Sequence, residues 1–421
     1  MSSSPLGYLP DYRYPNLRSV PGYGRFIQER FDRCLDLYLC PRTIKKKINI
    51  DPESLIPKLP SPKDLMPFPT TLSITYKGHS GRVRSVSVDP TGQWLASCSD
   101  DQSVRVWEVA TGRCLKSWNA EDSVLSVMWN PNKTVSLLAV AAQTRVLLIN
   151  PEVASAETIA FTNRANGFYA PFIDMRRSTY SEQSTKLCEW SRPSESERSA
   201  GHRVHMKFSK VVTYVTWHRK GDYFATVSPE GASSAVLVHQ LSKRQTQNPF
   251  RKSKGLIQRV LFHPSKPFLF VATQRYVRVY NLMKQELAKK LQTGAKWISS
   301  MDIHPGGDNV LVGTYDKRLC WFDMDLSTKP YKTLRYHKFA IREVSYHRRY
   351  PLFASCSDDG TVNIFHGMVY NDLMQNPLIV PVKTIRAHDI VENLGALHCE
   401  FHPSQPWIFT SGADKTIKLF S

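Results

Sequence analysis

The stretch VRSVSVDPTGQWLAS, residues 83–97, decides the fold. It consists of a β-rich run, a short turn at Asp89-Pro90 and a second β-rich run, which together predict a two-stranded hairpin. Six further stretches repeat this pattern, beginning at Val124, Val212, Ile257, Ile298, Ile341 and Ala396. A unit that recurs along a chain predicts a repeat architecture, in which each unit buries its apolar surface against its neighbours.

The spacing of the seven copies fits one repeat length. Their turns lie at residues 89, 130, 218, 263, 304, 347 and 402, so the successive spacings are 41, 88, 45, 41, 43 and 55 residues. Repeats of about 40–45 residues are typical of β-propeller blades. The interval of 88 residues predicts an insertion at about 151–203, which holds no copy of the pattern. A hidden eighth blade is the alternative, but this Ser-, Glu- and Arg-rich segment offers little apolar chain for three strands.

The first copy also carries polar residues at fixed spacing. Gly78-His79 precede the copy, Ser97 ends it, and Asp101 and Trp107 follow it. This set resembles a WD repeat, and the resemblance implies a hydrogen-bonded chain of the His, Ser, Asp and Trp side chains across the blade. The fold class expected is all-β: a seven-bladed WD-repeat β-propeller with an amino-terminal helix and an extended Pro-rich strap.

Later copies keep parts of this set. Two blades keep three members each and place Phe365 or Phe420 at the Trp position; the members kept are His337, Ser355 and Asp359, and His388, Thr410 and Asp414. A third blade keeps less of the set, with Asp316 at the Asp position and Phe322 at the Trp position. In two middle blades Ile149 or Tyr280 takes the Trp position. We expect those blades to rely on packing, so a search tuned to the full set should count too few blades.

The ends of the repeat region predict how the ring closes. The chain stops at TIKLFS, which reads as the third strand of the last repeat, and TLSITY (71–76) has strand alternation without a repeat of its own. We expect 71–76 to supply the missing outer strand, because this removes an exposed sheet edge. The propeller domain is therefore predicted over 71–421. Shorter insertions are expected at 239–255 and 366–383, between the third and fourth strands of a blade.

Residues 1–70 do not repeat. One helical stripe of apolar residues ends at Cys40-Pro41; it comprises Ile27, Phe31, Cys34, Leu35, Tyr38 and Leu39. One amphipathic helix is predicted there. Prolines at 52, 57, 60, 62, 67 and 69 then favour an extended strap. The strap lies either on the propeller's own side or on another protein or RNA.

Composition narrows the functional classes. Fifty-six Lys and Arg residues against 36 Asp and Glu leave a net charge of +20, which favours polyanionic partners, nucleic acid first; general solvation of a large surface is the alternative. No apolar run approaches the ~20 residues of a membrane span, and Pro, Asp and Arg interrupt any signal-peptide pattern at the start. Eight cysteines without paired spacing fit a reducing compartment and no disulfides.

Clusters of basic residues are the candidate contacts. Such clusters position a protein on phosphates without reading base sequence, and nearby aromatics such as Phe250 and Tyr350 favour RNA. The candidate RNA-binding residues are Lys45, Lys46, Lys47, Arg176, Arg177, Lys243, Arg244, Arg251, Lys252, Lys254, Arg348 and Arg349. The candidate partner-binding residues, at one rim of the ring, are Arg82, Arg84, Lys338 and Arg342.

Signatures of catalysis do not appear. The sequence has no phosphate-binding loop ending in Gly-Lys-Ser/Thr, no Gly-x-Ser-x-Gly motif and no Asp-rich calcium loop, so no enzyme and no cofactor are expected. Cys34 with Cys40, or His202 with His205, could be part of a zinc site, but no set of four ligands has suitable spacing. His218, His263, His304, His347 and His402 recur at one repeat position, which indicates structural turn residues.

A longer resemblance covers residues 22–69 and extends into the first repeat. YGRFIQERFDRCLDLYLCPR, then NIDPESLIPKLPSPKDLMPFPT, then a Gly-His WD repeat is similar to the eukaryotic block-of-proliferation family of ribosome biogenesis proteins. Members of that family have a longer region ahead of this point, so the resemblance implies that this chain corresponds to the carboxy-terminal part.

The resemblance also implies a function. It implies a nucleolar and nucleoplasmic, non-catalytic assembly factor of the large ribosomal subunit that is needed for pre-rRNA processing. The implied partners are a Pescadillo family protein, a WD-repeat protein with a ubiquitin-like domain, and precursor rRNA, with no membrane. The alternative is a peptide-recognition WD-repeat adaptor, such as a ubiquitin-ligase or chromatin receptor, that binds an acidic peptide at the channel mouth.

Overall fold

The computed structural model describes residues 13–16, 19–40, 60–165, 187–250, 255–370 and 376–421. They belong to two compact units, Met1–Leu59 and Pro60–Ser421. The first unit contains helix α1 (Tyr23–Leu39), which ends at Cys40 as the apolar stripe predicts. No residue of α1 is buried.

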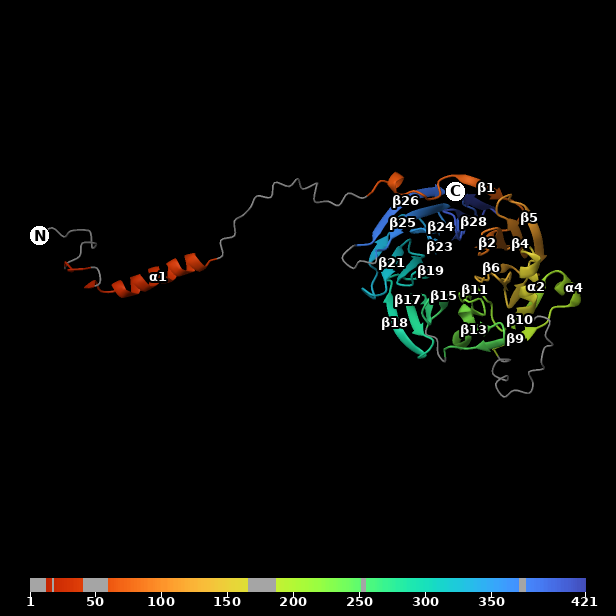
Figure 1. Ribbon diagram of the computed structural model, residues 1–421, viewed down its shortest axis with the longest axis horizontal. Helices are drawn as coiled ribbons and strands as arrows, with labels where there is room; N and C mark the ends of the chain where they lie inside the picture. Colours follow the sequence, from red (N-terminus) through yellow and green to blue (C-terminus); the bar gives the residue numbers. More distant parts are fainter. Residues whose placement is uncertain (1–12, 17–18, 41–59, 166–186, 251–254, 371–375) are drawn as a thin grey trace. The chain divides into compact units, whose positions relative to one another are not determined.

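The second unit is a ring of seven antiparallel sheets, six with four strands and one with five, so the predicted seven-bladed propeller is confirmed (Figure 1). Blades 1 and 2 consist of β2 (Val83–Val88), β3 (Trp94–Ser99), β4 (Ser103–Glu108) and β5 (Cys114–Asn119), and of β6 (Val124–Trp129), β7 (Leu138–Ala142), β8 (Arg145–Ile149), β10 (His202–Phe208) and β9 (Cys188–Ser191). Blades 3 and 4 consist of β11 (Tyr214–Trp217), β12 (Tyr223–Val227), β13 (Val236–Gln240) and β14 (Gln245–Gln247), and of β15 (Ile257–Phe262), β16 (Phe268–Thr273), β17 (Tyr276–Asn281) and β18 (Glu286–Gln292). Blades 5 and 6 consist of β19 (Ile298–Ile303), β20 (Asn309–Thr314), β21 (Leu319–Asp323) and β22 (Lys332–Leu334), and of β23 (Ile341–Tyr346), β24 (Leu352–Ser357), β25 (Thr361–Met368) and β26 (Leu378–Arg386).

Blade 7 joins the two ends of the propeller chain. Its strands are β27 (Ala396–Phe401), β28 (Ile408–Gly412), β29 (Ile417–Phe420) and β1 (Leu72–Tyr76), which pairs antiparallel with β29. The carbonyl of Ser421 accepts hydrogen bonds from the amides of Thr70 (2.8 Å) and Thr71 (3.0 Å). The outer strand of the last blade therefore comes from the segment that precedes the first repeat.

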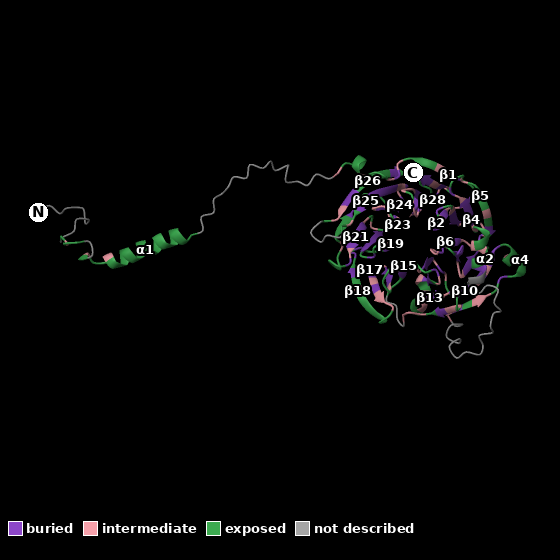
Figure 2. Cartoon of the chain, viewed as in Figure 1, coloured by how far each residue is buried: buried purple, intermediate pink, exposed green. Residues whose placement is uncertain are grey.

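The apolar core lies between the blades rather than at the centre of the ring. Seven clusters of buried residues each join two neighbouring blades, and purple buried segments line the inner strands in Figure 2. Alternate residues of each strand face the preceding or the following blade, so both faces of a sheet are covered. Each blade thus depends on its neighbours for burial.

Part of the predicted strap lies on the propeller's own surface. Within residues 60–70, the short helix η3 (Pro62–Leu65) begins with a capping box of Ser61 and Asp64, and Leu65 and Phe68 pack against the cluster between blades 6 and 7. Residues 41–59, which hold the rest of the strap, are outside the described part of the chain.

The segment predicted as an insertion, 151–203, lies between the third strand β8 and the fourth strand β10 of blade 2 and overlaps β10 only at residues 202–203. Residues Cys188–Ser191 and His202–Phe208 form β9 and β10, the fifth and fourth strands of blade 2, and β10 pairs with β8. The remainder includes helices α2 (Ala156–Ala165) and α4 (Glu195–Ser199). β9 has only four residues and lies among polar residues, so periodicity does not reveal it, whereas the seven residues of β10 alternate between buried and more exposed positions.

The shorter predicted insertions fare differently. The fourth strand of blade 3, β14, lies inside 239–255, so an insertion between the third and fourth strands of that blade is wrong; a turn at 241–244 joins them. In blade 6 a longer connection does separate β25 from β26, although both strands extend into the predicted range 366–383.

Candidate functional site

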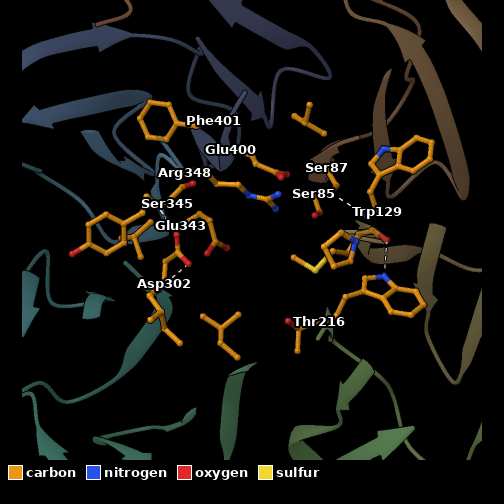
Figure 3. Close-up of a pocket in the computed structure, with 18 of the residues that line it drawn as sticks. Ser85, Ser87, Trp129, Thr216, Asp302, Glu343, Ser345, Arg348, Glu400 and Phe401 are labelled. Atoms are coloured by element: carbon orange, nitrogen blue, oxygen red, sulfur yellow. Dashed lines mark hydrogen bonds between the residues drawn. The ribbon is translucent and has the colours of Figure 1, made fainter. Parts of the chain in front are cut away.

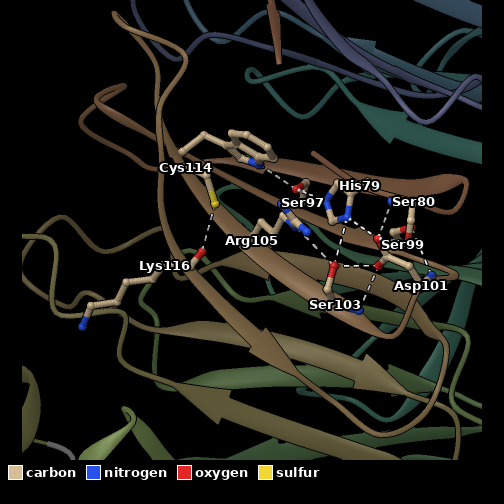
Figure 4. A network of polar contacts seen from close by, with 10 residues as sticks. His79, Ser80, Ser97, Ser99, Asp101, Ser103, Arg105, Cys114 and Lys116 are labelled. Atoms are coloured by element: carbon tan, nitrogen blue, oxygen red, sulfur yellow. Dashed lines mark hydrogen bonds and ion pairs between the residues drawn. The ribbon is translucent and has the colours of Figure 1, made fainter. Parts of the chain in front are cut away.

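A hydrogen-bonded chain crosses blade 1 (Figure 4). Trp107 Nε1 donates to Ser97 Oγ (2.8 Å), the Ser97 hydroxyl donates to His79 Nε2 (2.8 Å), and His79 Nδ1 donates to Asp101 (3.0 Å). The direction of each bond follows from the network, since Trp can only donate and a carboxylate can only accept. The chain satisfies buried polar groups and ties β3 and β4 to the loop before β2.

Two of these groups have shifted pKa values. Burial lowers the pKa of His79, so the ring is neutral at pH 7. Burial alone would raise the pKa of Asp101, but hydrogen bonds from Ser103 and from the backbone of Ser80 outweigh it and lower the pKa. The pair is therefore a neutral imidazole donating to a carboxylate.

Blades 6 and 7 contain the same chain without the Trp. His337 contacts Ser355 (2.8 Å) and Asp359 (3.2 Å), and His388 contacts Thr410 (2.9 Å) and Asp414 (3.0 Å). All three chains bond inward, to residues of their own blade. This arrangement stabilises a blade, and its polar side chains are already hydrogen-bonded within that blade.

Blade 3 has a polar network that the sequence did not predict. Its centre is His239, whose Nε2 lies 2.9 Å from the Thr226 hydroxyl and whose Nδ1 lies 2.9 Å from the Thr246 hydroxyl. Thr246 also contacts Trp190 Nε1 (2.9 Å) and Cys188 (2.8 Å) on β9 of blade 2. Burial lowers the pKa of His239 to about 3. Cys188 and Thr246 belong to different blades and are 58 residues apart in the sequence, so the spacing within one repeat does not predict their contact.

The five turn histidines are structural, because each one accepts hydrogen bonds within its own turn. Nδ1 of each ring accepts a backbone amide two or three residues ahead; the rings are His218, His263, His304, His347 and His402. His347 Nε2 also donates to the carbonyl of Gln405 (2.8 Å), and His402 Nε2 to that of Gly92 (3.1 Å). These bonds link neighbouring blades.

The ring encloses a central cavity of about 460 Å³, lined mainly by first strands and by the turns that follow them (Figure 3). Asp302, Glu343, Glu400 and Arg348 project into it. Burial raises the pKa of Asp302 to about 7 and that of Glu400 to about 8. Asp302 accepts from the amide of Tyr346 (2.6 Å), and Glu343 pairs with Arg259 (2.7 Å). Asp302 thus joins blade 5 to blade 6, whereas the pair of Glu343 and Arg259 joins blade 6 to blade 4, which is not its neighbour in the ring.

The candidate partner-binding arginines have carboxylate partners inside the molecule. Arg84 donates twice to Asp100 (2.8 Å each), Arg342 pairs with Asp358 (2.7 Å), and Arg82 contacts Glu392 of blade 7. Three of the four candidate partner-binding residues are therefore already paired with carboxylates of the same chain. Lys338 is exposed beside Phe339.

The candidate RNA-binding residues are divided between described and undescribed segments. Lys243 and Arg244 lie on the turn between β13 and β14, and Arg348 and Arg349 on the turn between β23 and β24. Because neighbouring strands are antiparallel, both turns belong to one face of the ring, here called the bottom face. The others are outside the described residues: Lys45, Lys46, Lys47, Arg176, Arg177, Arg251, Lys252 and Lys254.

The described residues do not assemble a candidate metal site. The rings of His202 and His205 contact each other (3.1 Å), and Cys34 and Cys40 are exposed free thiols of the first unit. Within the described ranges, no group of three or more His, Cys, Asp or Glu side chains could hold a metal ion. No helix in this described part is long and apolar enough to cross a membrane.

Comparison with known families divides the chain at residue 69, whereas the structure divides into its two compact units after Leu59. Residues 3–69 match the BOP1NT (NUC169) domain, and residues 70–108, 286–323, 328–366 and 379–421 match the WD domain, G-beta repeat. The repeat is thus detected in four stretches, whereas the ring has seven blades. The prediction that the weaker middle blades would be undercounted is confirmed.

Similar proteins match almost the whole chain. It is 57% identical over 416 residues to the ribosome biogenesis protein bop1-B of Xenopus laevis and 57% identical over 417 residues to bop1 of Danio rerio. It is 53% identical over 416 residues to BOP1 of Homo sapiens. Each match covers 99% of this chain but 56%, 52% and 55% of the respective relative, so the chain spans about half the length of these proteins.

Proposed function

Because the chain belongs to the Bop1 family of ribosome biogenesis proteins, we propose that it is a non-catalytic scaffold for assembly of the large ribosomal subunit, needed for pre-rRNA processing. The observation that supports this most is the use of buried polar groups. In blades 1, 6 and 7 the His–Asp chains hold the blade together, and in the channel Asp302 links blade 5 to blade 6 while Glu343 links blade 6 to blade 4.

A rigid ring of this kind suits a scaffold. Its seven inter-blade clusters fix the blades relative to one another, so the loops at both ends of the sheets are presented in constant positions. The net charge of +20 supports binding to an RNA-rich particle.

The partners proposed follow from the family. They are a Pescadillo family protein, a WD-repeat protein with a ubiquitin-like domain and precursor rRNA, in the nucleolus and nucleoplasm. The intramolecular pairing of Arg82, Arg84 and Arg342 means that a partner at this rim would have to compete with carboxylates already in place.

Affinity purification of the tagged chain after crosslinking to RNA tests this proposal. We expect precursor rRNA of the large subunit and both protein partners in the purified material. A variant lacking residues 71–76, which removes β1 and so prevents proper closure, serves as the misfolded control. Recovery of ubiquitin-ligase or chromatin components with no ribosomal precursor would overturn the scaffold proposal in favour of a peptide adaptor.

A further inference from the structure

The face opposite the turn histidines, here called the top face, has exposed aromatic rings beside lysines in three adjacent loops. Two loops precede the first strands of blades 5 and 6 and present Lys296-Trp297 and Lys338-Phe339; the third, between β20 and β21, presents Tyr315 and Lys317. These six residues are called the aromatic–lysine platform. Trp297, Tyr315 and Phe339 are 40%, 38% and 52% exposed, which is unusual for three large neighbouring rings on a soluble ring of sheets.

The backbone of the platform is held in place by blade carboxylates. Asp316 accepts the amide of Lys296 (2.7 Å), and Asp359 accepts the amide of Lys338 (2.9 Å). Tyr315 donates its amide to the carbonyl of Trp297 (3.1 Å). The loops are therefore fixed before any ligand arrives, which lowers the entropic cost of binding.

The rings form a connected surface. Trp297 and Tyr315 meet edge to face, with centroids 6.3 Å apart and an interplanar angle of 89°, so the two rings are not stacked on each other. The Lys317 ammonium lies 5.6 Å from the centre of the Phe339 ring, and the Arg342 guanidinium 5.3 Å from that of Tyr315. Blades 5 and 6 thus share one patch of rings and cations.

The platform's lysines are available to an anion. None of Lys296, Lys317 and Lys338 forms an ion pair with another residue in the described ranges, in contrast to Arg342, which pairs with Asp358. In blade 7 the loop before the first strand has Asp389 and Ile390 where blade 6 has Lys338 and Phe339. Lys415 follows the turn residue Asp414, as Lys317 follows Asp316 in blade 5. The combination of rings and unpaired cations is specific to blades 5 and 6 among these three blades.

We propose that the aromatic–lysine platform binds single-stranded RNA, with bases stacked on Trp297, Tyr315 or Phe339 and phosphates on the three lysines. The proposal rests on the proposed function only in that RNA is the expected polyanion. Aromatic faces alternating with cations suit unpaired bases, whereas duplex RNA keeps its bases stacked inside and an acidic peptide would use the lysines alone. The site lies on the face opposite Lys243, Arg244, Arg348 and Arg349.

Fluorescence anisotropy with labelled oligouridine, run on the full chain, tests the platform. We expect Phe339→Ala and Trp297→Ala each to weaken binding about tenfold, because each removes a stacking surface. Changing Lys296, Lys317 and Lys338 together to Gln should lower the slope of log K against log salt by about 2, as expected for three lost phosphate contacts on a single strand. The matched control, Ile390→Ala with Lys415→Gln, makes the same kind of change on blade 7 and should leave binding within twofold.

Competing outcomes separate this inference from the proposed function. If the parent binds oligouridine and the platform variants, with unchanged thermal melts, bind equally well, the platform is refuted while RNA binding by the scaffold stands. If the parent binds no RNA at all, both the platform and the RNA part of the proposed function fail. Loss of binding to polyglutamate, but not to oligouridine, in the same variants would assign the surface to an acidic protein segment and overturn the RNA assignment.

Discussion

Blades 1 and 6 are built on the same polar frame but present different loops. In both, a His contacts a Ser at 2.8 Å and an Asp, and that Asp accepts a backbone amide of the preceding loop at 2.9 Å. In blade 1 this amide belongs to Ser80, followed by Gly81; in blade 6 it belongs to Lys338, followed by Phe339. The frame is shared and the exposed side chains are not.

The space around the two loops explains this difference. A Cβ atom at Gly81 would lie 2.8 Å from the amide nitrogen of Asp101, so blade 1 cannot place a side chain there without a shift. Phe339 lies in the open and is half exposed. The comparison teaches that residues which stabilise a blade and residues which can bind a ligand are separate sets, even within one loop.

The largest expected effect concerns the aromatic residue of the third strand. Trp107→Ala and Phe365→Ala each remove a fully buried ring and should lower the free energy of unfolding by ~3–5 kcal/mol. Trp107→Ala should cost about 1 kcal/mol more, because Ser97 also loses its indole donor. Denaturant unfolding of both variants measures the difference. Losses below that range in both would contradict the role given to the third strand.

The carboxylates of the two frames should behave alike with pH. The pKa values of Asp101 and Asp359 are lowered in the folded chain, so their stabilisation is present above the ordinary carboxyl pKa near 4 and is lost as the pH falls below it. Asp101→Asn and Asp359→Asn should each cost about 2 kcal/mol at pH 7.

That cost should shrink as the pH falls from 5 to 3, because the unfolded parent chain then takes up a proton at each Asp while the lowered pKa keeps the folded carboxylate charged. Unfolding curves at pH 7, 5 and 3 provide the measurement. A penalty independent of pH in either variant would mean that the charge of the carboxylate does not contribute.

Substitution of the residue that follows the shared amide should lower stability in blade 1 but hardly change it in blade 6. Gly81→Ala forces a Cβ against Asp101 and Ser99 and should cost about 1–2 kcal/mol of stability. Thermal unfolding reports it directly. A neutral result would show that the blade 1 loop has room to move, and that the contrast with blade 6 is not steric.

Phe339→Ala should have the smallest effect on stability. Its side chain is half exposed and contributes to no core cluster, so the change in unfolding free energy should stay within about 0.5 kcal/mol. The same denaturant titration serves for this variant. A loss above 1 kcal/mol would place Phe339 among the stabilising residues.

Much of the frame could be predicted from the sequence because it depends on local spacing. Seven hairpin copies gave the blade number, and the stripe from Ile27 to Leu39 predicted α1. The polar chain was inferred by resemblance from Gly78-His79, Ser97, Asp101 and Trp107, which lie within one repeat.

The remaining features depend on contacts between distant segments. β9 reaches blade 3 through Thr246, and Arg259 of blade 4 pairs with Glu343 of blade 6, so neither contact shows in the spacing of one repeat. The aromatic–lysine platform gathers three loops that only the ring brings together. Searching for runs of basic residues missed it because each loop contributes a single lysine at the surface patch.

Paired measurements on Trp107→Ala and Phe339→Ala test most directly whether frame and binding surface are separate. Unfolding free energy and oligouridine affinity would be measured on both, with affinity taken where each variant is fully folded. We expect Trp107→Ala to lose ~3–5 kcal/mol of stability and keep its affinity, and Phe339→Ala to keep its stability and lose about tenfold in affinity. If stability and affinity fell together in both variants, the separation of the two residue sets would be contradicted.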